Sequence, residues 1–216
     1  MIENIVNYII KSPWWKIFLT IWLVHLINLF IYNQFVWSED IYFSGSGMNT
    51  KYGTFESVMR RNRNFDLLFY FLSPFWLFIK VILVSFFVFM GSQLADLKTT
   101  FIHILKLATL SYVVILIGDI SNTIYFLVIS PPIHRDEIDF FYPWSLMNVT
   151  SDYFLQKNQM FVLRRLHLFQ LFFVFAISIL FSFVNKEKIG KSVFLVFSSY
   201  GLAYLAFLGI VYLINM

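Results

Sequence analysis

Residues 101–130 read FIHILKLATLSYVVILIGDISNTIYFLVIS, an apolar run long enough to cross the ~30 Å hydrocarbon core of a bilayer as an α-helix. Four more runs of this kind follow one another along the 216-residue chain. The predicted spans are 17–37, 67–91, 101–130, 161–184 and 192–214. Hydrophobic residues make up 59% of the chain and Phe occurs 28 times, which is more apolar surface than a water-soluble fold can bury.

These runs are apolar on every face, whereas the strands of a membrane β-barrel alternate in polarity over ~10 residues. Helices satisfy every backbone group internally, as lipid requires. The sequence therefore predicts an all-α fold: a polytopic transmembrane bundle of five spans, forming a single membrane domain over 1–216. We expect a small loop cap over one mouth of the bundle, built from 38–66 and 131–160, and an interfacial helix at 2–10.

The composition excludes several classes of function. The chain has no cysteine, so it has no disulfides, thiolate metal sites or thiol catalysis. A net charge of +4 falls short of the dense basic face that nucleic-acid binding requires. HExxH, Walker A and GxGxxG motifs are absent, and the four histidines lack the spacing of a metal site. We therefore expect a non-enzymatic protein without metal or cofactor.

The basic residues of the connections bear on the orientation. The short connection 185–191 carries three lysines, which favours the cytoplasmic side. Arg60, Arg61 and Arg63 lie before the second span and favour the opposite orientation. We expect the N-terminus inside and the C-terminus and cap outside. The first apolar run exceeds the length of a signal-peptide core, so we expect it to remain as a span.

Two charges fall inside predicted spans, where each costs ~2.5–3.5 kcal/mol on insertion scales. They are Lys80 and Asp119, on neighbouring antiparallel spans. Either they form an ion pair, or Lys80 extends towards the headgroups while Asp119 bonds with Ser121 and Asn122. In the first span, His25 is predicted to be a core residue with its hydrogen bonds satisfied.

The segment LRRLHLFQ, residues 163–170, opens the fourth predicted span. Spacing of i and i+3 places Arg164, His167 and Gln170 on one helix face, next to Arg165. The basic residues Arg164, Arg165 and His167 are interpreted either as a site for a lipid phosphate or carboxylate or as a basic collar at the membrane surface.

The connection 131–160 combines an acidic segment, HRDEID, with an aromatic one, FYPWSLMN. Tyr and Trp favour the membrane interface and are suited to anchoring a partner. The predicted partner-binding surface of the cap comprises Tyr142, Trp144, Asp136, Glu137 and Asp139.

Two functions remain open. The first is a scaffold or regulatory subunit that binds membrane lipids and another membrane protein or a second copy of itself. The second is a small transporter or channel-like protein that uses Lys80 and Asp119. Gly118, Gly201 and Gly209 are predicted to let helices approach closely.

Several segments resemble the Yip1-domain family of five-span membrane proteins. These are KSPWWKIF, TTFIHILKLATLSYVVILIGD, FYPWSLMN and VFSSYGLAYLAFLGIVYL. The resemblance implies a cytosolic N-terminus and a scaffold role like that of eukaryotic members in vesicle trafficking, and it supplies no catalytic residues. Lys80 and the Arg164–Arg165–His167 cluster match no part of the family's pattern. A composition rich in Phe, Ile and Lys suggests a bacterial inner membrane.

Overall fold

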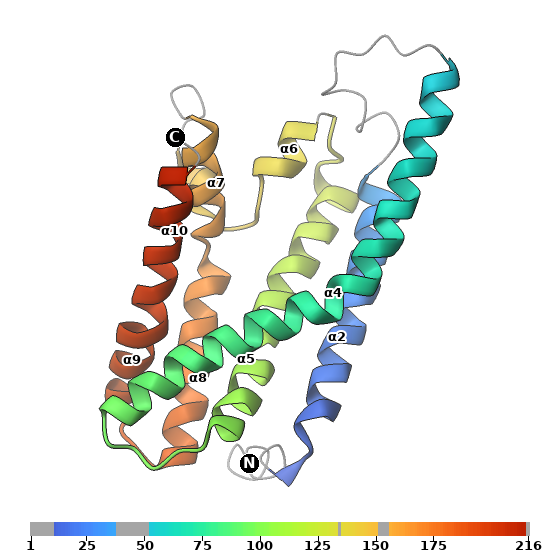
Figure 1. Ribbon diagram of the computed structural model, residues 1–216. Helices are drawn as coiled ribbons and strands as arrows, with labels where there is room; N and C mark the ends of the chain where they lie inside the picture. The colour runs from blue at the N-terminus through green and yellow to red at the C-terminus, as the bar shows by residue number, and fades with distance from the viewer. Residues whose placement is uncertain (1–10, 38–51, 134, 151–155, 215–216) are drawn as a thin grey trace.

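Five helical segments long and apolar enough to cross a membrane form the body of the protein (Figure 1). The computed structural model describes residues 11–37, 52–133, 135–150 and 156–214. The candidate spans are Trp14–Val36, Leu67–Leu94, Phe101–Ile129, Leu168–Asn185 and Ile189–Ile214. Every regular element in that part of the chain is helical, which confirms the predicted all-α bundle.

Three spans pass into a wider π-helical turn (η1, η2 and η5), and three short helices lie between spans. In order, the elements are α2 (Trp14–Ile31), η1 (Tyr32–Val36), α4 (Tyr52–Leu94), α5 (Phe101–Ile124), η2 (Tyr125–Ile129), α6 (Arg135–Phe140), η3 (Leu146–Val149), α7 (Lys157–Arg165), α8 (Leu168–Asn185), α9 (Ile189–Val196), η5 (Phe197–Gly201) and α10 (Leu202–Ile214). Helix α2 begins at one end of the bundle and α10 finishes at the other (Figure 1).

Helix α5 is the centre of the bundle and packs against α2, α4 and α8. Half of its most apolar stretch is buried, whereas only 6% of the corresponding stretch of α2 is. Leu107 and Ala108 of α5 belong to one apolar core with Leu77 of α4 and Ile177 of α8. The outward faces are also apolar, as expected where lipid rather than water covers them.

The half of the bundle away from the cap is held together by small hydroxyl side chains. Ser85, Thr109 and Ser178 are fully buried. Each donates a hydrogen bond of 2.6–2.7 Å to the carbonyl four residues earlier in its own helix. The donor of each buried hydroxyl is thereby satisfied within its own helix, and Thr109 also accepts from the Trp14 indole of α2 at 2.8 Å. The small size of these side chains lets helices pack closely.

Helix α4 is strongly tilted and changes direction along its length (Figure 1). Pro74 lies inside it and has no N–H for the carbonyl of Tyr70. The Ser73 hydroxyl donates to that carbonyl at 2.9 Å, and the Trp22 indole of α2 donates to Ser73 at 3.0 Å. The polar groups that the proline would leave unpaired are therefore satisfied within the membrane.

The cap covers the ends of α2 and α5. Ile138 of α6 packs with Val36 and Phe126 in a second apolar cluster. Phe141 stacks on Tyr125, with ring centroids 4.2 Å apart. These contacts attach the segment after α5 to the mouth of the bundle.

The predicted fourth span, 161–184, is wrong at its start. Helix α7 ends at Arg165, and α8 begins at Leu168 after two non-helical residues, of which His167 is extended. The gap forms a short antiparallel pairing with the cap: Leu146 N–H donates to Leu166 O at 2.9 Å, and Leu168 N–H to Trp144 O at 3.1 Å. The chain therefore enters the membrane at residue 168, and the i, i+3 spacing of residues 164–170 does not place them on one helix face.

The predicted first part of the cap, 38–66, is also wrong in part. Residues 52–66 form the start of α4, which projects past the other helices instead of folding over them (Figure 1). Residues 38–51 and the predicted interfacial helix at 2–10 lie outside the described residues.

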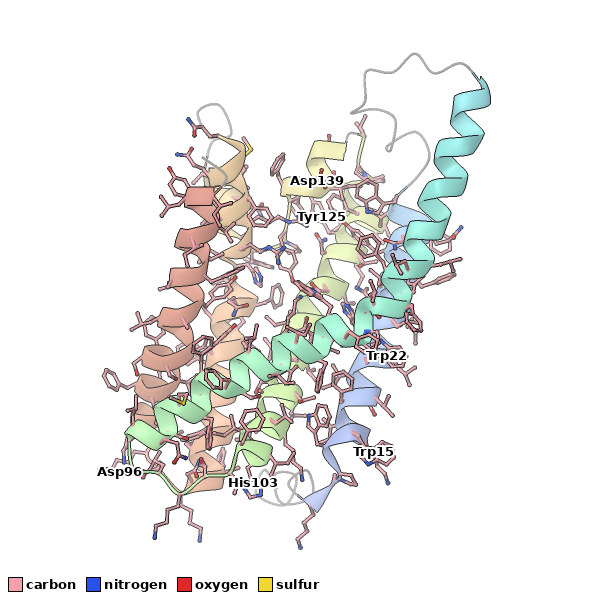
Figure 2. The ribbon with its side chains drawn as sticks, in the orientation of Figure 1. Trp15, Trp22, Asp96, His103, Tyr125 and Asp139 are labelled. Carbon is pink, nitrogen blue, oxygen red and sulfur yellow. The ribbon has the colours of Figure 1, made fainter. Side chains whose placement is uncertain are left out.

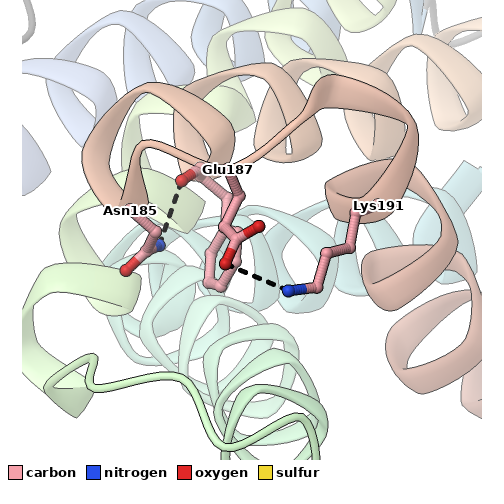
Figure 3. A network of polar contacts seen from close by, with 4 residues as sticks. Asn185, Glu187 and Lys191 are labelled. Carbon is pink, nitrogen blue, oxygen red and sulfur yellow. Dashed lines mark hydrogen bonds and ion pairs between the residues drawn. The ribbon is translucent and has the colours of Figure 1, made fainter.

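At the other end, the connection between α8 and α9 is a tight hairpin (Figure 3). Lys186 adopts the left-handed conformation that ends α8, with φ 55°. The Asn185 amide donates to Phe181 O at 3.0 Å, and Lys191 pairs with Glu187 at 3.0 Å. The hairpin satisfies the last carbonyls of α8.

Gly91 of α4 marks a close approach to η5. A Cβ at this position would lie 2.6 Å from Ser199 Cβ. Gly209, where the sequence predicts close packing, has nothing within 4 Å of such an atom.

We expect Gly91→Ala to separate α4 from η5 and to lower the free energy of unfolding by about 1–3 kcal/mol, because a packed interface must shift. Gly209→Ala is the matched control and should leave stability unchanged or slightly higher. Thermal unfolding in detergent measures both. Equal melting temperatures for the two variants would contradict the packing described here.

Candidate functional site

Three ionisable side chains from three spans come together in the cap half of the bundle. They are His25 of α2, Lys80 of α4 and Asp119 of α5, here called the intramembrane polar cluster. Each is partly buried, and each interacts electrostatically with the other two. Helix α5, which carries Asp119, packs against both α2 and α4.

Asp119 forms neither of the two arrangements that the sequence left open. No ion pair joins it to Lys80, and both residues lie in the described part of the chain. The Lys80 ammonium instead lies 5.5 Å from the centre of the Trp76 ring. Ser121 donates to Ile117 O and not to Asp119. The hydrogen-bond donor to Asp119 is Tyr142, whose Oη lies 3.0 Å from Oδ1.

Tyr142 was predicted to face a partner, but it points into the bundle. Only 8% of its surface is exposed. A Cβ on residue 118 would lie 2.5 Å from its hydroxyl oxygen, so Gly118 leaves the space that the hydroxyl occupies. The Tyr142 ring also contacts the His167 ring, with centroids 4.3 Å apart and the planes tilted by 35°. Burial raises the pKa of Tyr142, so its hydroxyl remains a hydrogen-bond donor.

Trp144 is the exposed aromatic residue of the predicted partner-binding surface, with 69% of its surface accessible. Ser145 N–H donates to Tyr142 O at 3.2 Å, which makes Tyr142–Ser145 a turn with Pro143 second and Trp144 third. Trp144 has φ 59°, a conformation that this turn position normally reserves for glycine. A bulky residue held there is strained.

The acids of the predicted partner-binding surface have separate environments. Glu137 is exposed and accepts from Ile133 N–H at 3.0 Å. The backbone carbonyl of Asp139, a partly buried residue at the cap end (Figure 2), accepts from the Arg164 guanidinium. The side chain of Asp136 lies outside the described residues.

The three basic residues of the predicted anion site point in different directions. Arg164 is partly buried and reaches the cap through Asp139 O. Arg165 is exposed, and its guanidinium lies 5.1 Å from the centre of the Phe161 ring. His167 caps α8 by accepting from Gln170 N–H at Nδ1, 3.1 Å away. The break after α7 is what separates them.

Gln170 and Asn122 were singled out from the sequence, but three polar partners near the cluster, Tyr32, Tyr200 and Tyr204, were missed because each lies alone on an apolar helix. Gln170 donates to the Tyr200 hydroxyl at 2.7 Å, and the Tyr204 hydroxyl donates to Arg165 O at 2.9 Å. Tyr32 interacts with the side chain of the buried Asn122. These side chains point inwards because of how the helices pack. The hydrophobic periodicity of the sequence does not indicate which face is buried when every face of a helix is apolar.

Two buried atoms in this region have no hydrogen-bond partner within the described structure. They are His25 Nδ1 and Asn122 Oδ1. The sequence predicted that the hydrogen bonds of His25 are satisfied, but its Nδ1 atom has no partner among the described residues. A buried polar atom without a partner in a protein of this kind indicates a place where a water molecule or ligand binds.

The described residues contain no group of three His, Cys, Asp or Glu that could hold a metal ion. Comparison with known protein families, curated proteins and solved structures finds no match for this chain. The resemblance to the Yip1-domain family stays a prediction.

The cap of α8 predicts a response to pH. Burial lowers the pKa of His167 to about 4, and the neighbouring Arg165 and Arg164 act in the same direction. Between pH 6.5, the ordinary pKa of histidine, and about pH 4, the imidazole of His167 therefore stays neutral in the folded protein but is protonated in the unfolded chain. The contribution of His167 to stability is present above pH 6.5 and falls by about 1.4 kcal/mol per pH unit towards pH 4.

We expect amide-exchange protection at the start of α8 and in the paired segment of the cap to decrease between pH 6.5 and 4.5. His167→Asn is the matched control, because its oxygen also caps the helix but does not titrate in this range. Protection that falls equally in both proteins would show that another group is responsible.

Proposed function

We propose that this protein is a small transporter or channel-like protein in which an ion or small charged solute passes through the intramembrane polar cluster. The observation that carries the proposal is the convergence of His25, Lys80 and Asp119 from three spans. Charges at membrane depth are rare, almost always face the bundle interior or a water-filled cavity, and mark substrate, ion or proton pathways in membrane proteins.

The hydrogen-bonding pattern supports this proposal. A purely structural charge pair would be closed by a direct contact, but Lys80 lies over Trp76 and Asp119 bonds to the cap. The partnerless His25 Nδ1 adds a buried group that is available to a transient ligand. In this proposal the Tyr142 hydroxyl closes the cap side and leaves Asp119 when a solute enters.

We further propose that the cap faces outwards from a bacterial inner membrane, with the N-terminus in the cytoplasm. The two short connections, 95–100 and 186–188, lie at the end where α2 begins, and both carry lysine (Figure 1). Lysine in short connections favours the cytoplasmic side.

Asp119→Asn tests the proposed pathway. Asparagine is nearly isosteric and still accepts from Tyr142, so the protein should fold normally while the charge is lost. We expect parent proteoliposomes to pass at least one of H⁺, K⁺ and Cl⁻ faster than protein-free vesicles, and Asp119→Asn to abolish that flux. Asp96→Asn, in the connection at the other end of the bundle (Figure 2), is the matched control and should behave like the parent. Equal flux for Asp119→Asn and the parent would remove the role assigned to Asp119.

A scaffold function is the second candidate, and the exposed, strained Trp144 favours it. Strain at an exposed residue persists where that side chain has a use. This function would also agree with the predicted Yip1-domain resemblance, in which a membrane protein or a second copy docks on the cap.

Trp144→Gly separates the indole from the turn, because glycine takes the positive φ without strain. We expect the variant to fold at least as well as the parent and to lose any partner cross-linked through the cap in native membranes. Unchanged cross-linking would assign the indole to the lipid interface instead.

A further inference from the structure

The intramembrane polar cluster has more positive than negative charge around it. Asp119 interacts electrostatically with Lys80 and Arg165 as well as with His25. Lys80 and Arg165 interact unfavourably with each other. Arg164 is set apart from this group, because it interacts with Asp139 and donates to its carbonyl. Two cations therefore share one carboxylate.

That carboxylate is already engaged. Its Oδ1 accepts from Tyr142 at 3.0 Å, and it forms no ion pair with Lys80. The Lys80 ammonium lies over the Trp76 ring, 5.5 Å from its centre, and such a cation–π contact stabilises the charge only weakly. A partly buried ammonium with so little compensation favours an additional anion beside it.

The neighbouring groups suit an anion as well. His25 Nδ1 is buried without a partner and, in the tautomer that carries its proton there, donates a hydrogen bond. Arg165 is exposed at the cap end, where an arriving anion meets it first. The basic groups thus run from the surface at Arg165 to the interior at Lys80.

We propose that the intramembrane polar cluster binds a small anion, a carboxylate or phosphate group, between Lys80 and His25, with Arg165 at its entrance. This inference rests on the proposed transport function and names the class of its solute. The anion neutralises the positive charge of Lys80 and Arg165 that Asp119 alone does not balance. It also reduces the repulsion between Lys80 and Arg165. The same chemistry is offered by a free anion and by the headgroup of an anionic lipid.

Tryptophan fluorescence of the purified protein in nonionic detergent tests the proposal, because Trp76 lies beside Lys80. The probes are acetate, inorganic phosphate and dihexanoyl phosphatidylglycerol, with dihexanoyl phosphatidylcholine as the zwitterionic control and sodium chloride, which has neither a carboxylate nor a phosphate group, to hold ionic strength constant. We expect a saturable change with at least one anionic probe, and Trp76→Phe should remove the signal. Saturation with acetate or phosphate identifies a free anion, and saturation with phosphatidylglycerol alone identifies a lipid headgroup.

Lys80→Met should weaken binding by about tenfold or more, since a charge-assisted contact is lost. Lys98→Met, at the other end of the bundle, is the matched control and should retain the parent affinity. If Lys80→Met does not fold, Lys80→Arg and Arg165→Gln replace it: the first should keep binding and the second should weaken it. No saturable change with any probe, or equal affinity of the parent and the neutralised variants, would overturn the anion site.

The two proposals fail in different ways. Flux of H⁺ or K⁺ that depends on Asp119, without anion binding, retains the transport function and removes the anion site. Saturable binding of acetate or phosphate, without flux of that anion or of H⁺, K⁺ or Cl⁻ in proteoliposomes, retains the site and removes transport.

Discussion

A carboxylate placed inside a bilayer is the constraint around which this fold is arranged. Asp119 lies on the central helix, where a charge costs ~2.5–3.5 kcal/mol on insertion scales. The hydrogen bond from Tyr142 offsets part of that cost, and Gly118 leaves the space that the donor requires. Because Tyr142 belongs to the segment between α5 and α7, the same bond attaches the cap to the middle of the bundle.

The break between α7 and α8 determines how the basic residues are used. The two non-helical residues, Leu166 and His167, pair with the cap. The chain therefore passes from the cap to the spanning helix α8 within two residues. Arg164 then donates a hydrogen bond to Asp139 O in the cap, and Arg165 stays at the surface. The His167 side chain accepts from the first turn of the spanning helix α8. A continuous helix would have directed these residues along one stripe and left the Tyr142 turn without its backbone partners.

The spans could be predicted from sequence because length and hydropathy are the physical requirements for crossing lipid, and both are readable in one dimension. The break at residue 166 could not, since the segment LRRLHLFQ has no proline or glycine to mark it; the cap supplies the hydrogen bonds that replace the helical ones. Lys80 and Asp119 could be identified from the sequence because a charge inside a membrane span is energetically costly and therefore rare. Their partners could not be identified, because contacts among apolar helices leave no periodic pattern in the sequence. Tyr142 was assigned to the surface since its aromatic neighbours suit an interface, and only the packing around Gly118 shows that it turns inwards.

The two halves of the bundle differ in how firmly they are joined. Away from the cap, small buried hydroxyl side chains, the hydrogen bond from Trp14 to Thr109 and the contact at Gly91 bring the helices close together. Towards the cap, the segment after α5 is attached by the bond from Tyr142 to Asp119, two main-chain bonds, the bond from Arg164 to Asp139 O and the apolar cluster around Ile138. In the proposed transport function, a molecule arriving from the cap side would have to displace only these cap contacts to reach Asp119, whereas its onward path would require whole helices to part. Exchange with one compartment should therefore be fast relative to passage between the two.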